Sequence, residues 1–229
     1  MKHYYVRKVL DHEQLKVVND AIQQSNQNNF WNDGLYTGGG TRSVKNNVEL
    51  NNPQLSQTIN DMIMSSLDRD DGFINFTTPR NTNLNIISKT TSGGYYNPHF
   101  DNWNNGDYST TVFLNDPSEY DGGELCLYIG GEDEEKIKLD AGWAVTYSTG
   151  TIHRVNKVIR GTRYVSVFWT KSLISDPFIR FIHGELGNIQ NKLPANEHSV
   201  HLPNCISALN DPYFLLKNLQ TQILRRYAS

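Results

Sequence analysis

The fold class is decided by residues 108–170, YSTTVFLNDPSEYDGGELCLYIGGEDEEKIKLDAGWAVTYSTGTIHRVNKVIRGTRYVSVFWT, in a chain of 229 residues. Short runs rich in β-branched and aromatic residues follow one another here at intervals of roughly ten residues. Turn signals separate them, among them DGG at 121–123, DAG at 140–142 and IRG at 159–161. One more such run, LNIISK at 84–89, precedes the stretch. Short strands at this spacing predict an antiparallel sandwich or barrel.

Helices are expected on both sides of this β-rich block. In the first of them Asp11 is a plausible cap with Gln14 at the third position, and apolar residues such as Val17 and Val18 follow at helical spacing. The four expected helical ranges are 11–25, 52–67, the stretch after Pro177, and 210–226. Loops are expected at Gly34–Gly40, which lacks the lysine of a phosphate-binding loop, and around 188–204.

Composition limits the classes of function. The formal net charge is −3 and the pI is about 6.1, so no global basic field favours a nucleic-acid partner. The apolar runs are far shorter than the ~20 residues of a membrane helix, and the N-terminus lacks the apolar core of a signal peptide. Cys126 and Cys205 are far apart, which favours two free thiols in a reducing cytosol over a disulfide. The chain is therefore expected to be cytoplasmic, without a membrane partner.

The strongest chemical signal is the tripeptide His99-Phe100-Asp101. Side chains alternate along a strand, so the imidazole and the carboxylate would point to one face and could chelate one cation. That donor set suits Fe(II), Mn(II) or Zn(II). Of the other histidines only His153 lies in the same β-rich block, and it would complete a 2-His-1-carboxylate triad with open metal positions. Taken alone, the tripeptide could also occur by chance.

Arg163 is expected at the start of a strand that follows a turn at 159–162 and runs antiparallel to the strand of His153. Alternate residues from there would share one face: Arg163, Val165, Val167 and Trp169. A buried arginine needs a carboxylate partner, because an unpaired buried charge is costly. Glu124 could supply it, and so could a dicarboxylate ligand gripped by a bidentate guanidinium. The alternative is a solvent-facing arginine on an outer strand.

Several blocks around these residues follow one another in a characteristic order. They are Tyr96-Asn-Pro-His99-Phe-Asp101-Asn102, Thr111-Val-Phe-Leu-Asn115, Tyr120-Asp-Gly-Gly-Glu-Leu125, Ala141-Gly142, His153-Arg-Val-Asn156 and Gly161-Thr-Arg163. Together they resemble the prolyl-hydroxylase branch of the 2-oxoglutarate/iron dioxygenases, and within it the bacterial PKHD-type hydroxylases. The resemblance covers roughly residues 83–182 and is weaker outside them.

The resemblance implies a mainly β chain with flanking helices around a double-stranded β-helix, or jelly roll. Three segments of one compact domain are then expected. Residues 1–80 form an N-terminal helical and β segment that packs on the core, 81–182 the double-stranded β-helix catalytic core, and 183–229 a C-terminal helical extension. The apolar segment 205–229 could pack on the barrel or build a dimer interface.

The resemblance also implies roles for individual residues. His99, Asp101 and His153 match the metal ligands, and Arg163 matches the residue that holds the distal carboxylate of 2-oxoglutarate. The other positions are these: Tyr96 and Trp169 as pocket-lining aromatics, with core packing an equal alternative for Trp169; Lys89 or Thr111 as the second group at the distal carboxylate; and Tyr95, Asn102 and Trp103 toward the substrate. Some relatives carry a tyrosine where Lys89 stands, and a structural role is favoured for this lysine.

The implied activity is hydroxylation of an unactivated C–H bond with Fe(II), 2-oxoglutarate as cosubstrate and O2; ascorbate binding is left open. Asp101 favours hydroxylation, because relatives that halogenate lack the carboxylate. A prolyl residue in a protein or peptide is the expected substrate, with a free amino acid or another small molecule as the enzymatic alternative. A non-catalytic jelly-roll module, with a structural Zn(II), is the alternative outside enzymes.

Overall fold

The computed structural model describes residues 3–36, 44–83, 85–102, 104–130, 133–193 and 211–228. The chain forms two compact units, one of residues 1–67 and 82–170 and one of residues 68–81 and 171–229. Each is described by itself below. The division into segments 1–80, 81–182 and 183–229 stays a prediction.

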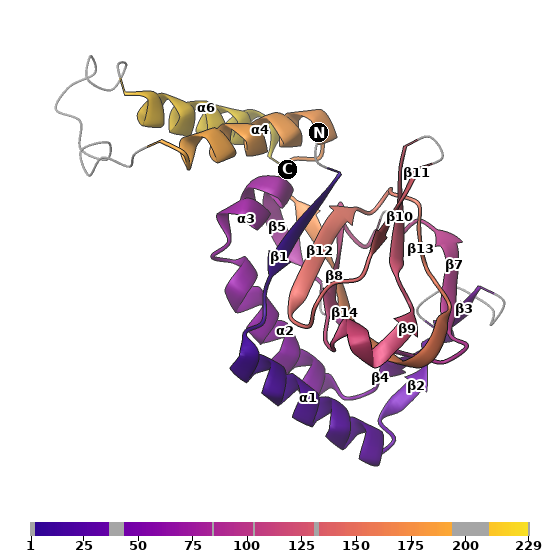
Figure 1. The fold of residues 1–229 in the computed structure, drawn as a ribbon. Helices are drawn as coiled ribbons and strands as arrows, with labels where there is room; N and C mark the ends of the chain where they lie inside the picture. The colour runs from indigo at the N-terminus through magenta and orange to yellow at the C-terminus, as the bar shows by residue number, and fades with distance from the viewer. Residues whose placement is uncertain are drawn as a thin grey trace. The chain divides into compact units, whose positions relative to one another are not determined.

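The first unit contains two antiparallel sheets (Figure 1). The large sheet has the strand order β1 (Tyr4–Lys8), β12 (Trp143–Ser148), β8 (Tyr108–Phe113), β14 (Val158–Ser172), β6 (Ile86–Thr91), β4 (Val48–Leu50) and β2 (Trp31–Asp33). The small sheet has the order β11 (Asp133–Ile137), β10 (Leu125–Gly130), β13 (His153–Val155), β7 (Tyr95–His99) and β3 (Lys45–Asn46). The expected antiparallel β core is therefore confirmed, and every predicted run between 84 and 170 overlaps a strand.

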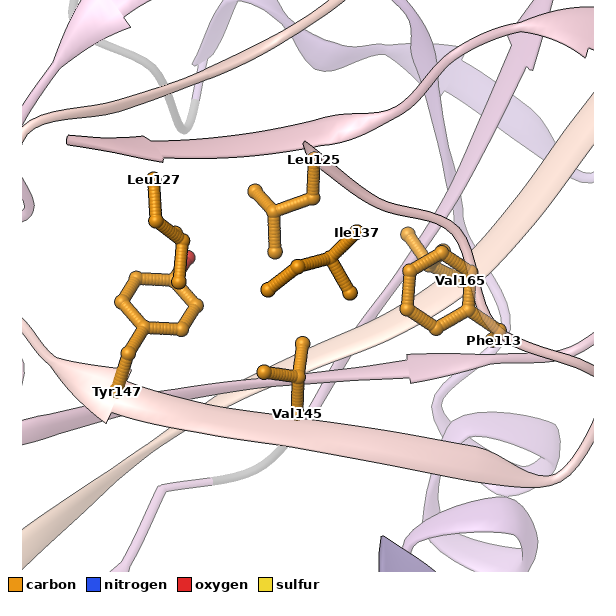
Figure 2. Packing of buried hydrophobic residues seen from close by; sticks show 7 residues of the cluster. All are labelled: Phe113, Leu125, Leu127, Ile137, Val145, Tyr147 and Val165. Carbon is orange, nitrogen blue, oxygen red and sulfur yellow. The ribbon is translucent and has the colours of Figure 1, made fainter. Parts of the chain in front are cut away.

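The core of this unit lies between the sheets, as Figure 2 shows. Its buried side chains come from the large sheet and from the small one: Phe113, Val145, Tyr147 and Val165, and Leu125, Leu127 and Ile137. These residues alternate along their strands with outward-facing ones, as the two-residue repeat of a strand requires. The alternation brings inner-face residues of both sheets together.

The expected turn at 159–162 is wrong. β14 runs without reversal from Val158 to Ser172, and Gly161 is a strand residue paired with Tyr120 of β9 (Tyr120–Gly122). Its φ is +79°, and a Cβ at this position would lie 2.0 Å from the carbonyl oxygen of Glu119. The glycine thus permits a close backbone approach and makes no turn. As a result β13 and β14 belong to different sheets and are not antiparallel neighbours.

Two helices complete the first unit. α1 (His12–Gln27) begins with the predicted capping box of Asp11 and Gln14, and α2 (Pro53–Leu67) follows the short strands β2 to β4. Val18 and Ile22 are buried, whereas Val17 is 46% exposed and lies outside the apolar face. η1 (Gly34–Tyr36) occupies the start of the predicted Gly-rich loop, and the rest of that loop lies outside the described residues.

The second unit contains α3 (Asp71–Thr77), α4 (Pro177–Gln190) and α6 (Pro212–Tyr227), and β5 (Pro79–Thr82) begins in it. α4 contacts both α3 and α6. The helices predicted after Pro177 and within 210–226 are confirmed, while most of the loop predicted at 188–204 lies outside the described residues. Within the described ranges, no helix has the length and apolar character needed to cross a membrane.

Candidate active site

A cavity of about 350 Å³ opens between the two sheets of the first unit. The small sheet contributes His99 and His153 to its wall, and the large sheet contributes Thr111, Arg163 and Trp169. The residues that the sequence singled out on different strands therefore share one cavity.

His99, Asp101 and His153 form a cluster in which one ligand atom from each lies within 4.8 Å of the others. His99 and His153 are paired across β7 and β13. The expectation that Asp101 lies on the same strand as His99 is wrong, since β7 ends at His99. A backbone hydrogen bond from the Asp101 N–H to the Thr149 carbonyl, at 3.1 Å, holds the carboxylate position beyond the strand. Two oxygens of Asp101 lie 4.0 Å from His99 Nε2 and 3.9 Å from His153 Nε2.

The backbone orients both imidazoles for metal binding. His99 Nδ1 lies 2.8 Å from the carbonyl oxygen of Asn97, and His153 Nδ1 lies 2.9 Å from that of Thr151. A carbonyl only accepts, so each Nδ1 carries the proton and each Nε2 keeps its lone pair for a metal. Tyr96 stacks on the His99 ring at 3.6 Å between centroids and restricts its rotation.

Burial, followed by the charge of neighbouring His153, lowers the pKa of His99 from 6.5 to about 4. The unfolded chain therefore takes up this proton at a higher pH than the folded chain does. As the pH falls from about 6.5 to about 4, His99 should lower the free energy of unfolding of the metal-free protein. We expect urea unfolding to show the metal-free protein losing stability relative to its His99→Gln variant across this window. A difference that stays flat would contradict the burial of a neutral imidazole.

The large sheet holds Asp101 in place. The Ser109 hydroxyl and the Trp169 indole N–H both donate to Oδ2 of Asp101, the indole at 3.0 Å. Ser109 and Trp169 are cross-strand partners on β8 and β14, so they act from the same point of the sheet. With Oδ2 engaged twice, Oδ1 is the oxygen left for a metal. Sequence reasoning missed Ser109, although the alternation of β8 places it on the same face as Thr111.

Loss of the indole contact should weaken metal binding while the fold persists. We expect Trp169→Phe to lower the Fe(II) affinity about tenfold, in the range typical of residues that orient a metal ligand. Trp31→Phe is the matched control, because the Trp31 indole N–H is buried without a partner among the described residues. Equal Fe(II) affinities of the two variants, measured by anaerobic titration, would show that the contact does not position Asp101.

Arg163 lies in the same cavity and is 3% exposed. Its Nε has no hydrogen-bond partner among the described residues, and burial lowers the pKa of the guanidinium. The solvent-facing alternative is therefore wrong. Glu124 accepts a hydrogen bond from Asn156 at 2.8 Å and forms no ion pair with Arg163 within the described chain. A buried cation that lacks a protein carboxylate fits an anionic ligand.

Thr90 stands beside Arg163, as its cross-strand partner on β6, and it also lines the cavity. Lys89 points to the opposite face, where its Nζ donates to Asn26 Oδ1 at 2.7 Å and lies 5.1 Å from the Trp31 ring centre. Lys89 therefore has the structural role that was favoured for it. Thr111 and Tyr147 line the cavity as well, and burial raises the pKa of the Tyr147 hydroxyl, which stays a proton donor.

The proposed substrate-facing residues are only partly covered. Tyr95 and Asn102 line the cavity, whereas Trp103 lies outside the described residues. Sequence reasoning missed a further polar pair on the wall, Lys45 and Glu49, whose charged atoms are 2.7 Å apart. Contacts of Tyr96, Thr111 and Trp169 with a cosubstrate stay predictions.

Comparison with known proteins shows the superfamily and the fold of this chain. Residues 84–171 match the family described as the 2OG-Fe(II) oxygenase superfamily. A prolyl hydroxylase from Trichoplax adhaerens, solved in complex with a hypoxia inducible factor oxygen degradation domain peptide fragment, shares the fold with a TM-score of 0.61 at 14% identity, over 74% of this chain and 84% of that one. A Pseudomonas putida prolyl-4-hydroxylase has a TM-score of 0.57 at 15% identity, over 74% and 92%.

The sequence relatives define the family within that class. A PKHD-type hydroxylase of Maricaulis maris is 35% identical over 197 residues, which cover 84% of this chain and 88% of that protein. The chain therefore belongs to the PKHD-type hydroxylases of the 2OG-Fe(II) oxygenase superfamily. Membership implies Fe(II), 2-oxoglutarate and O2, and the jelly-roll fold expected from the sequence is confirmed.

Proposed function

We propose that this chain hydroxylates a prolyl residue in a protein or peptide, with Fe(II) held by His99, Asp101 and His153 and 2-oxoglutarate anchored by Arg163. The observation that carries the proposal is a three-residue metal cluster in the same cavity as a buried arginine that has no carboxylate partner among the described residues. A metal and a dicarboxylate together would satisfy both features. A structural metal alone would leave the buried guanidinium without an anionic partner.

Some residues of the cavity would bind the metal and the cosubstrate, and others would limit the access of water. Bound Fe(II) and 2-oxoglutarate would supply the oxidising chemistry together with O2, of which one oxygen atom converts 2-oxoglutarate to succinate and CO2 and the other becomes the hydroxyl group of the substrate. Arg163 would grip the distal carboxylate with parallel hydrogen bonds, and the hydroxyls of Thr90, Thr111 and Tyr147 lie on the same wall. Apolar side chains line the same cavity and would limit the access of water to a bound metal: Leu125, Val155, Val165 and Val167.

The proposal of a prolyl peptide as substrate rests on similarity to other proteins. The chain resembles the prolyl-hydroxylase branch in its motifs, and one protein that shares its fold was solved with a peptide. A nogalamycin-pathway carbocyclase also shares the fold, with a TM-score of 0.54 at 11% identity, so the fold by itself is compatible with other substrates. A free amino acid is therefore the outcome that competes with a prolyl peptide.

The first test is the anaerobic visible spectrum of the protein with Fe(II) and 2-oxoglutarate. An absorbance band that needs both additions is expected, because a 2-oxo acid chelated to Fe(II) absorbs in the visible. Succinate release and oxygen incorporation with blocked proline peptides then test the substrate, with free proline as the competing case. Iron bound without the band would overturn the oxygenase proposal. Hydroxylation of free proline, but of none of the peptides, would overturn the proposal that the substrate is a protein or peptide.

A further inference from the structure

Two large apolar side chains lie in solvent beside the metal ligands. Phe100, between His99 and Asp101, is 68% exposed, and Ile152, next to His153, is 50% exposed. His99 and His153 pair antiparallel at the end of β7 and the start of β13, so Phe100 and Ile152 both lie directly beyond this last pair. Phe100 also lines the mouth of the cavity. Exposed apolar groups gathered at one place mark a binding surface more often than solitary ones do.

A second hollow, of about 320 Å³, adjoins the cavity and shares three of its wall residues, Tyr95, Tyr96 and Val155. We call it the side groove. Its remaining wall residues come from β7, from β13 and from the segment after β13: Asn97, Pro98, Arg154 and Lys157. Pro98 on β7 and Arg154 on β13 lie two residues along the chain from Phe100 and Ile152, which directly adjoin the ends of these strands. The side groove thus continues the surface that begins at the cavity mouth.

In the part of the chain that the structure describes, Lys157 is a positive charge of the side groove without an ion-pair partner. Arg154 is neutralised by Glu134 through two hydrogen bonds, Nε to Oε1 at 2.7 Å and Nη2 to Oε2 at 3.0 Å. Lys157 is exposed and makes no ion pair with any residue in the described ranges. An acidic group in the side groove would meet an attractive charge, and a basic group would meet a repulsive one.

We propose that Phe100, Ile152 and the side groove bind the chain of a peptide substrate on one side of the hydroxylated residue, with an apolar side chain on Phe100 and Ile152 and an acidic side chain beside Lys157. The inference rests on the proposed function and adds to it the chemistry of the residues that flank the hydroxylated one. A free amino acid would fit within the cavity and would leave both features unused. An extended peptide has the length to occupy the cavity mouth and the side groove together.

Fluorescein-labelled blocked peptides with a central proline, flanked by leucine and glutamate, test this surface. Anisotropy would measure their binding to full-length protein loaded with Zn(II) and 2-oxoglutarate, and mass spectrometry would measure hydroxylation with Fe(II). We expect Phe100→Ser and Ile152→Ser each to weaken binding about tenfold. Lys157→Glu should reverse the preference for glutamate over lysine in the peptide, and added salt should reduce that effect.

Matched controls separate docking from general loss of apolar surface. Phe178→Ser removes a phenylalanine that is 62% exposed on α4, and Val17→Ser removes a valine that is 46% exposed on α1; neither lines the cavity or the side groove. Both should bind the peptides as the unaltered protein does. Titration of 2-oxoglutarate into each variant checks that the cosubstrate site is intact.

The outcomes distinguish the docking surface from the proposed function. If all variants bind the peptides with equal affinity and hydroxylate them, the docking surface is overturned and prolyl hydroxylation is supported. Peptides that bind with the expected pattern of losses but are never hydroxylated would support the surface and overturn prolyl hydroxylation. Absence of binding by every peptide, while 2-oxoglutarate still binds, would overturn the surface.

Discussion

His153→Ala is expected to abolish Fe(II) binding and the Fe(II)–2-oxoglutarate absorbance band together. His153 is 5% exposed, and its Nδ1 faces the Thr151 carbonyl at 2.9 Å, so Nε2 is the nitrogen available to a metal. The change leaves one imidazole and one carboxylate, and the site loses its third anchor. The Fe(II) affinity should fall more than about a hundredfold, beyond the range seen for residues that only orient ligands. Anaerobic titration of metal-free protein measures the loss.

His183→Asn is the matched control for that variant. His183 is another buried histidine, 7% exposed, and its Nδ1 contacts Thr78 Oγ1 at 3.3 Å in the second unit. This control can lose stability, but it should keep the absorbance band. If His153→Ala retained the band at ordinary iron concentrations, the ligand set would be wrong and another donor would have to replace His153.

The metal triad and Arg163 could be predicted because the patterns that indicate them lie within short stretches of the sequence. His99 and Asp101 are two residues apart, and His153 was the only other histidine within the β-rich block. The apolar alternation around Arg163 indicated one shared face for this residue, with burial and exposure both left open before any pairing was known. Strand positions followed from β-branched runs between turn signals, and all predicted runs from 84 to 170 overlap strands of the structure. Local composition therefore predicted these strands and brought the triad and Arg163 forward as candidates, and the resemblance assigned their roles.

Pairing between distant segments could not be predicted in the same way. Counting back from His99 singled out Lys89, yet the inward residue beside Arg163 is Thr90. A shift of one residue moves a side chain to the other face of a strand, and the Ser92-Gly93-Gly94 turn hides the register. Ser109 was missed for a related reason. Its contact with Asp101 depends on which strands become neighbours, and no local pattern contains that information.

Arg163→Met is expected to have opposite effects on ligand binding and on stability. In the ligand-free protein Arg163 is a buried cation whose Nε lacks a partner among the described residues, which costs free energy. Methionine of similar length removes that cost, so the free energy of unfolding of the ligand-free variant should be equal to or higher than that of the unaltered protein. The dissociation constant for 2-oxoglutarate should rise on the order of a hundredfold, because a bidentate charged contact is lost.

The 2-oxo acid 2-oxobutyrate isolates the distal carboxylate, since it keeps the chelating end of 2-oxoglutarate and lacks the far charge. The unaltered protein should bind 2-oxoglutarate far more tightly than 2-oxobutyrate, and Arg163→Met should bind the two almost equally. Lys89→Met is the control, because its Nζ donates to Asn26 outside the cavity, and it should keep the full preference. Thermal shifts with each ligand report the same ordering, since only a ligand that binds the folded state raises its stability. A preference that survived in Arg163→Met would place the distal carboxylate on another residue, with the hydroxyls of Thr90, Thr111 and Tyr147 the next to replace.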